Sequence, residues 1–109
     1  MMQQAEIHWS DNEKKVAEIA LKKAYDQEVK ALIEGVREKA NLISLTEDVW
    51  QLHDFLSAKR HEIDGKYDDR EPFLMYTLSR LVKDGLLALS DLAELEADKQ
   101  AKISLLTRM

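Results

Sequence analysis

The sequence predicts an all-α protein, and three observations support that prediction. Leu, Ala, Glu and Lys dominate the composition, and these residue types favour helices over strands. Only three glycines and one proline interrupt the 109 residues. Apolar residues recur at spacings of three or four along most of the chain, which is the period of an amphipathic helix. A chain of this length is expected to form one domain, residues 1–109, around one core.

The first helix is predicted to be unusually long. Ser10 and Glu13 have the form of a capping box, which starts a helix. An apolar stripe runs from Leu21 to Ile43, interrupted by Gly35 at a cost of about 1 kcal/mol relative to alanine. Some thirty helical residues span about 45 Å, whereas a compact domain of this size is about 34 Å across. The helix would overhang its own domain, so we expect a second copy to cover it in an elongated homodimer.

The central helix is predicted to start at a second capping box, Ser44 with Glu47, and to end at Gly65 in a left-handed conformation. A helical projection of residues 47–64 gives this helix two different faces. The face expected to point inward carries Val49, Leu52, Phe55, Leu56 and Ile63. The opposite side and its edge carry Trp50, His53, Asp54, Ser57, Arg60, His61 and Asp64.

Two shorter helices are expected to follow. Asp69 caps the third helix, which has Pro72 in its first turn and ends at Gly85. Ser90 caps the last helix, one side of which is apolar. Basic residues that alternate with acids, and are therefore expected to be solvated, include Lys99, Lys102 and Arg108.

A tryptophan on the polar side of the central helix is the main functional signal. Trp50 beside histidine, aspartate and arginine is typical of the residues that dominate protein interfaces. The alternative is that Trp50 packs under the first helix of its own chain. Asp54 and Arg60 lie about 120° apart around the helix and cannot pair with each other there. Asp64, one turn beyond Arg60, could instead form an ordinary surface pair with it.

Net charge and cysteine count limit the possible functions. The 16 basic and 21 acidic side chains give a formal charge of −5, which argues against nucleic-acid and anionic-membrane binding. The absence of cysteine leaves no disulfide or thiolate chemistry and suits a reducing cytosol. No stretch approaches eighteen uncharged residues, so we expect no membrane insertion.

Catalytic and metal sites are disfavoured by the same residues that suggest an interface. His61 and Asp64 are spaced to share a metal ion, but no third ligand has a fitting position. His53 and Asp54 imitate an acid–base pair without a serine or threonine nucleophile placed to use it. We therefore expect neither an enzyme nor a cofactor.

The segment from Trp50 to Arg70, WQLHDFLSAKRHEIDGKYDDR, closely resembles the central segment of the fluorescence recovery protein family of cyanobacteria. The resemblance extends to the Trp9-Ser10 pair and to the sequence ADKQAKI at residues 97–103. It implies a small all-α homodimer that is not an enzyme and carries no cofactor.

The resemblance also implies a partner. Members of the family bind the C-terminal domain of photoactivated orange carotenoid protein, accelerate its red-to-orange reversion and promote its detachment from the phycobilisome, which restores antenna fluorescence. The carotenoid belongs to the partner. The implied location is cytoplasmic, near the cytoplasmic face of thylakoid membranes that carry phycobilisomes. The alternative from a different class is a generic helical dimerisation adaptor.

The family's functional positions can be matched to residues of this chain. The implied partner-binding patch comprises Trp50, His53, Asp54, Arg60, Tyr76 and Lys102. The implied dimer interface comprises Val49, Trp50, Asp54 and Arg60. At position 76 the family often has phenylalanine, so Tyr76 keeps the aromatic ring and adds a hydroxyl group.

Overall fold

The computed structural model describes residues 7–109, and its regular structure there is entirely helical, as the composition predicts. The elements in chain order are α1 (Asp11–Asn41), α2 (Thr46–Asp64), α3 (Glu71–Lys83), a short 3₁₀ helix η1 (Leu89–Leu92) and α4 (Ala97–Thr107).

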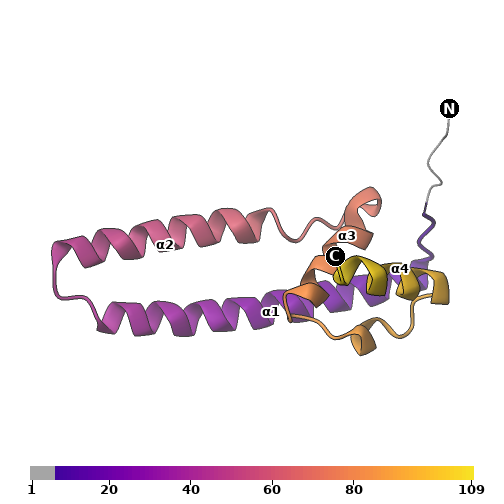
Figure 1. The fold of residues 1–109 in the computed structure, drawn as a ribbon, viewed down its shortest axis with the longest axis horizontal. Coiled ribbons are helices and arrows are strands. Elements are labelled where there is room, and N and C mark those ends of the chain that lie inside the picture. The colour runs from indigo at the N-terminus through magenta and orange to yellow at the C-terminus, as the bar shows by residue number, and fades with distance from the viewer. Residues whose placement is uncertain (1–6) are drawn as a thin grey trace.

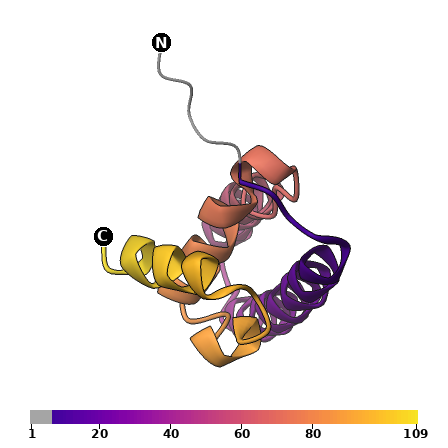
Figure 2. The same ribbon diagram turned by 90° about the vertical axis from the view of Figure 1, so that its right-hand side faces the viewer.

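The molecule has two regions of different character. In Figure 1, α1 and α2 form an antiparallel hairpin that projects from the cluster of α3, η1 and α4. We call residues 9–24 with residues 66–107 the head, and residues 25–64 the arm. Figure 2 looks from the head end, with the arm receding behind it. The overall dimensions are 57 × 33 × 25 Å and the radius of gyration is 17.4 Å, against about 13 Å for a compact chain of this length. The predicted elongated shape is confirmed.

The hydrophobic core lies in the head. Alanines on one side of α1 let the leucines of α3 and the C-terminal segment approach closely. The buried apolar residues are Trp9, Ala17, Ala20, Ala24, Leu74, Met75, Leu78, Leu81, Leu87, Leu92, Leu95 and Ile103. By contrast, α2 has no buried residue.

The predicted start and continuity of α1 are confirmed. Ser10 Oγ accepts from the backbone N–H of Glu13, and Glu13 Oε1 accepts from the N–H of Ser10, both at 3.1 Å. The helix continues through Gly35 for 31 residues. The apolar stripe that follows Leu21 is therefore held on a single rigid element.

The predicted start of α2 is wrong, although its end is close to the prediction. Leu45 is the N-cap, and Asp48 rather than Glu47 accepts from the N–H groups of Ser44 and Leu45, both at 3.0 Å. Gly65 closes the helix, but with φ −93° in the right-handed region. The helix begins at Thr46, two residues beyond Ser44, because Asp48 accepts from the N–H groups of the two residues that precede Thr46.

The third helix is capped by Arg70, so the prediction of Asp69 as its cap is wrong by one residue. The Asp68 carboxylate accepts from the N–H of Arg70 at 3.1 Å and from its guanidinium at 2.9 and 2.7 Å. Pro72 does lie in the first turn, and Gly85 follows the helix with a left-handed φ of 81°.

The single last helix predicted from Ser90 is wrong. Ser90 lies in η1, and α4 begins only at Ala97 after its N-cap Glu96. The N–H of Glu96 donates to Glu13 Oε2 at 3.0 Å. A carboxylate 83 positions earlier in the chain thus marks where α4 starts, and no local sequence signal contains that information.

Candidate protein-binding surface

Four predicted site residues share one exposed face of α2. Trp50 is 58% exposed, and His53, Asp54 and Arg60 are also exposed. The alternative that Trp50 packs under α1 of its own chain is wrong. The helical projection therefore placed this face correctly.

Contacts along this face leave its charged groups largely free. The rings of Trp50 and His53 meet edge to face with centroids 6.4 Å apart. His53 Nδ1 lies 3.3 Å from Asp54 Oδ1. Arg60 Nε lies 3.7 Å from Asp64 Oδ2, while the side chains of Arg60 and Asp54 remain 85% and 81% exposed. Arg60 thus meets Asp64 rather than Asp54, in agreement with their positions on the helix.

The surface around Asp54 and Arg60 is a shallow open hollow. Its lining residues are Asp54, Ser57, Ala58, Arg60, His61 and Asp64. An open, charged surface next to an exposed indole suits the side chains of another protein better than a small enclosed ligand.

The inward face predicted for α2 is only half buried, so that prediction is partly wrong. Leu52, Phe55 and Ile63 are partly covered by α1, whereas Val49 and Leu56 are 42% and 37% exposed. Long polar side chains occupy the space between the helices. Lys39 Nζ of α1 lies 4.6 Å from the Phe55 ring centroid.

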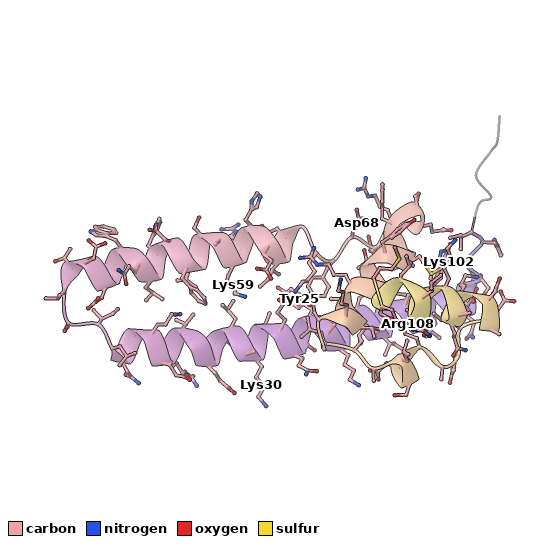
Figure 3. All side chains as sticks on the ribbon, in the orientation of Figure 1. Tyr25, Lys30, Lys59, Asp68, Lys102 and Arg108 are labelled. Atoms are coloured by element: carbon pink, nitrogen blue, oxygen red, sulfur yellow. The ribbon has the colours of Figure 1, made fainter. Side chains whose placement is uncertain are left out.

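The arm leaves apolar side chains uncovered on both of its helices. Those of α1, α2 and their connection include Tyr25, Ile33, Leu42, Leu45, Val49 and Leu56. Figure 3 shows Lys59 in the space between α1 and α2, whereas Lys30 points away from α2. The overhang predicted from the length of α1 is present, and no residue between positions 7 and 109 covers it.

The other two predicted site residues lie on the head. Tyr76 on α3 is 59% exposed, and Lys102 on α4 is exposed. Figure 3 shows Lys102 on α4, far along the molecule from the tip of the arm. The structure therefore separates the predicted residues into four on α2 and two on the head.

One basic residue was assigned wrongly from the sequence. Lys99, expected to be solvated, is 5% exposed. Its Nζ lies 3.0 Å from Glu13 Oε1 and 5.2 Å from the centroid of the Trp9 ring. Burial alone would raise the pKa of Glu13, but hydrogen bonds from Glu96 and Ser10 N–H and from Lys99 lower it to about 2. The pair joins the two ends of the chain inside the head.

Two negative findings apply to residues 7–109. None of the helices there has a window that is both long and apolar enough to cross a bilayer. Within the same range, no three His, Asp or Glu side chains come together as a metal site would require.

The fold and the site define an elongated helical protein whose candidate site is an exposed helix face, on an arm that extends from a small helical head. The family model of the photoprotection regulator fluorescence recovery protein matches residues 9–107. The chain belongs to this family of photoprotection regulators.

Individual relatives agree with the family match. The fluorescence recovery protein of Synechocystis sp. PCC 6803 is 47% identical over 109 residues, which cover the whole of both chains. The solved structure of the Fremyella diplosiphon fluorescence recovery protein is 52% identical, with a TM-score of 0.90 over 94% of this chain and all of that one. The solved Synechocystis structure is 46% identical, with the same TM-score and coverage. The family is thus one of photoprotection regulators.

Proposed function

We propose that this chain binds the C-terminal domain of photoactivated orange carotenoid protein and accelerates its return from the red to the orange form. It would also promote detachment of that protein from the phycobilisome, and so restore antenna fluorescence. The observation that carries the proposal is the exposed Trp50, His53, Asp54 and Arg60 surface on α2 of a chain in this family. The place of action that follows is the cytoplasm, at the cytoplasmic face of thylakoid membranes that carry phycobilisomes.

The proposed action requires binding and no covalent chemistry. A surface that fits the partner's compacting state better than its open state lowers the barrier between the two forms. A hundredfold acceleration needs about 2.7 kcal/mol of barrier reduction. One or two buried hot-spot residues supply that amount. Trp50 offers a large ring to bury, while Asp54 and Arg60 have ionic groups left to pair.

The active form is proposed to be a homodimer formed through the arm. The uncovered apolar residues of α1 and α2 support this proposal, because an overhanging apolar surface needs a cover. A twofold axis would place the same helix faces of two chains against each other. Val49 would lie in that interface with Trp50, Asp54 and Arg60, so three residues of the partner surface on α2 would also lie at the contact with the second protomer.

Arg60→Leu tests the partner surface. We expect a loss of acceleration of at least about tenfold, because a charged hydrogen bond to the partner is worth about 1.5–3 kcal/mol. The measurement is the dark recovery of photoactivated orange carotenoid protein, followed by its absorbance, at a concentration where sedimentation shows the variant to have the same oligomeric state as the unmodified protein. Arg37→Leu is the matched control, since Arg37 is an exposed arginine on α1 of the same arm. Full acceleration by Arg60→Leu, with unchanged helical content, would remove Arg60 from the site.

Val49→Glu tests the dimer. A carboxylate placed in an apolar interface without a partner is strongly unfavourable, and we expect the dimer dissociation constant to rise by about a hundredfold or more. Sedimentation over a concentration series measures it. Gln51→Glu adds the same charge about 200° around the helix and is the control. A compact monomer at micromolar concentration in the unmodified protein would contradict the dimer itself.

The second candidate function is a helical adaptor that uses the Trp50 surface only for self-association. The exposed apolar residues Val49 and Leu56 on the same helix favour it. The two candidates differ in one result. An adaptor would dimerise and leave the recovery of orange carotenoid protein at its unassisted rate.

A further inference from the structure

A buried lysine joins the arm to the head. Lys66 directly follows Gly65 at the end of α2 and is only 4% exposed. Its Nζ lies 2.9 Å from Glu28 Oε2 on α1, 3.2 Å from Asp84 Oδ2 at the end of α3, and 3.6 Å from Glu62 Oε2 on α2. One ammonium group therefore contacts carboxylates from three helices.

The position of this cluster along α1 is significant. Ala24 is the last residue of α1 that belongs to the core, and Glu28 lies one turn further on. Glu28 Oε1 also accepts from the Tyr67 hydroxyl at 2.6 Å. The Tyr67 ring meets the Tyr25 ring edge to face with centroids 5.4 Å apart. The cluster thus sits where α1 leaves the head and where α2 returns to it.

Other contacts hold α2 only weakly. The helix has no buried residue. The side chains it directs toward α1 are half exposed, and the Lys39–Phe55 contact at 4.6 Å is one of the few that bridge the two helices. The position of α2 relative to α1 and the head therefore depends on the contacts at its C-terminal end more than on packing along its length.

The balance of charge makes Lys66 difficult to replace. Three carboxylates surround one ammonium group, with further cations only at the margin, such as Arg80 Nε at 3.8 Å from Asp84. Burial alone would lower the pKa of Lys66, but its bonds to Glu28 and Asp84 raise it. The lysine stays charged at neutral pH. Without it, the largely buried Glu28 carboxylate would lose its ion pair and would face the carboxylates of Glu62 and Asp84, which are 40% and 37% exposed.

We propose that Lys66 is a positioning residue, whose ammonium group fixes α2 relative to the head by joining α1, α2 and α3. This sets the spacing between the Trp50 and Arg60 surface on the arm and Tyr76 and Lys102 on the head. The structural part of the proposal stands on the contacts of Lys66 alone. Its consequence for activity rests on the proposed function, because it matters only if one partner touches both groups.

The structural part is tested by a distance measurement. The chain has no cysteine, so spin labels on Gln51→Cys in the arm and Ser90→Cys in the head, both exposed, report one distance by pulsed electron paramagnetic resonance. An excess of unlabelled chain removes distances between protomers. Lys66→Met is expected to widen the distance distribution by about twofold, because the end of α2 that carries position 51 is then held to the head less firmly. An unchanged distribution would overturn the proposal.

Lys99→Met is the matched control. Lys99 is also a buried lysine, with Nζ 3.0 Å from Glu13, but all of its partners lie within the head. It should lower the thermal midpoint and leave the distance distribution narrow. Equal widening in both variants would mean general loosening and would also overturn the proposal. If Lys66→Met does not fold, Glu28→Gln replaces it under the same two criteria.

A second readout tests the consequence for activity. One partner molecule that binds the arm is held near the head, so its second contact forms at a high effective concentration. Loss of the Lys66 contacts would lower that effective concentration, because the distance between the two contact surfaces would vary more. We expect Lys66→Met to raise the half-saturating concentration for recovery by about tenfold and to keep most of the maximal rate. An unmodified chain that fails to accelerate recovery would refute the proposed function and leave the distance result standing. If the unmodified protein and Lys66→Met accelerated recovery with the same half-saturating concentration, the proposed effect of Lys66 on activity would be refuted.

Discussion

The head and the arm differ in how much of their apolar surface is buried within the chain. Residues 9–24 and 66–107 form the head and bury all twelve core side chains. The arm, residues 25–64, buries none of its apolar side chains. The head therefore buries its core side chains within one chain. The arm leaves apolar side chains exposed, as is typical of a surface that binds another molecule. This contrast explains why both the dimer and the partner surface are proposed on the arm.

The difference arises from side-chain size on α1. In the head, α1 presents Ala17, Ala20 and Ala24 to the leucines of α3, and small residues allow close packing. In the arm, α1 presents larger side chains such as Leu32 and Val36, and Lys59 lies between the helices (Figure 3). Much of the apolar surface of the arm therefore remains exposed.

The largest expected change in the free energy of unfolding comes from truncating a leucine side chain in the core. Leu78 has no exposed surface, so Leu78→Ala should lower the free energy of unfolding by about 3 kcal/mol. Urea denaturation followed by Trp9 fluorescence in a Trp50→Phe background measures it. The arm control is Leu56→Ala, at a side chain that is 37% exposed. It should cost less than about 1 kcal/mol at concentrations where the chain is monomeric. Equal losses at both positions would contradict the contrast between the two regions.

An intermediate effect is expected from the ion pair within the head. Glu13→Gln should lower the free energy of unfolding by about 2 kcal/mol at pH 7, because a hydrogen bond between charged groups is lost. The folded-state pKa of Glu13, about 2, lies below its ordinary value of 4.5. Its contribution is therefore present above pH 4.5 and disappears as the pH falls toward 2.

Thermal midpoints recorded from pH 7 to pH 2 measure this contribution. The gap between the unmodified protein and Glu13→Gln should close across that window. Glu18→Gln removes an exposed carboxylate from the same helix and should show almost no gap at pH 7. A gap that stays constant down to pH 2 would show that the Glu13 charge is not responsible.

The smallest expected effect is a change in the free energy of unfolding that has opposite signs in the arm and in the head. No described atom outside the local helix backbone lies within 4 Å of a Cβ placed on Gly35. Gly35→Ala should therefore raise the free energy of unfolding by about 1 kcal/mol, since alanine favours the helix. Gly85→Ala in the head should lower it, because Gly85 has a left-handed φ of 81°. Destabilisation by Gly35→Ala would indicate that another chain approaches α1 closely at this point.

Features encoded locally could be predicted from the sequence. The capping box of Ser10 and Glu13, the long α1, and the stop at Gly85 all depend on neighbouring residues, and the structure confirms them. The exposed side of α2 was also predicted, because a helical projection needs only the helix itself. The start of α2 was missed because both Glu47 and Asp48 could accept the orphan N–H groups, and geometry selects Asp48.

Features that depend on distant residues could not be predicted. Lys99 looked like a surface lysine until Glu13, 86 positions earlier, met it in the head. Lys66 gave no signal, because its three carboxylates come from separate helices. The start of α4 was missed for the same reason, since Glu13 accepts from Glu96. Tertiary packing decides each of these cases.

The head is assembled from both ends of the chain, with the arm inserted between Ala24 and Lys66. An insertion of two antiparallel helices behaves as a spacer of adjustable length. Removing two turns from each helix would bring the tip about 10 Å closer and leave every core side chain in place. Changes in the number of residues between these two points would therefore change the length of the arm without changing the packing of the head.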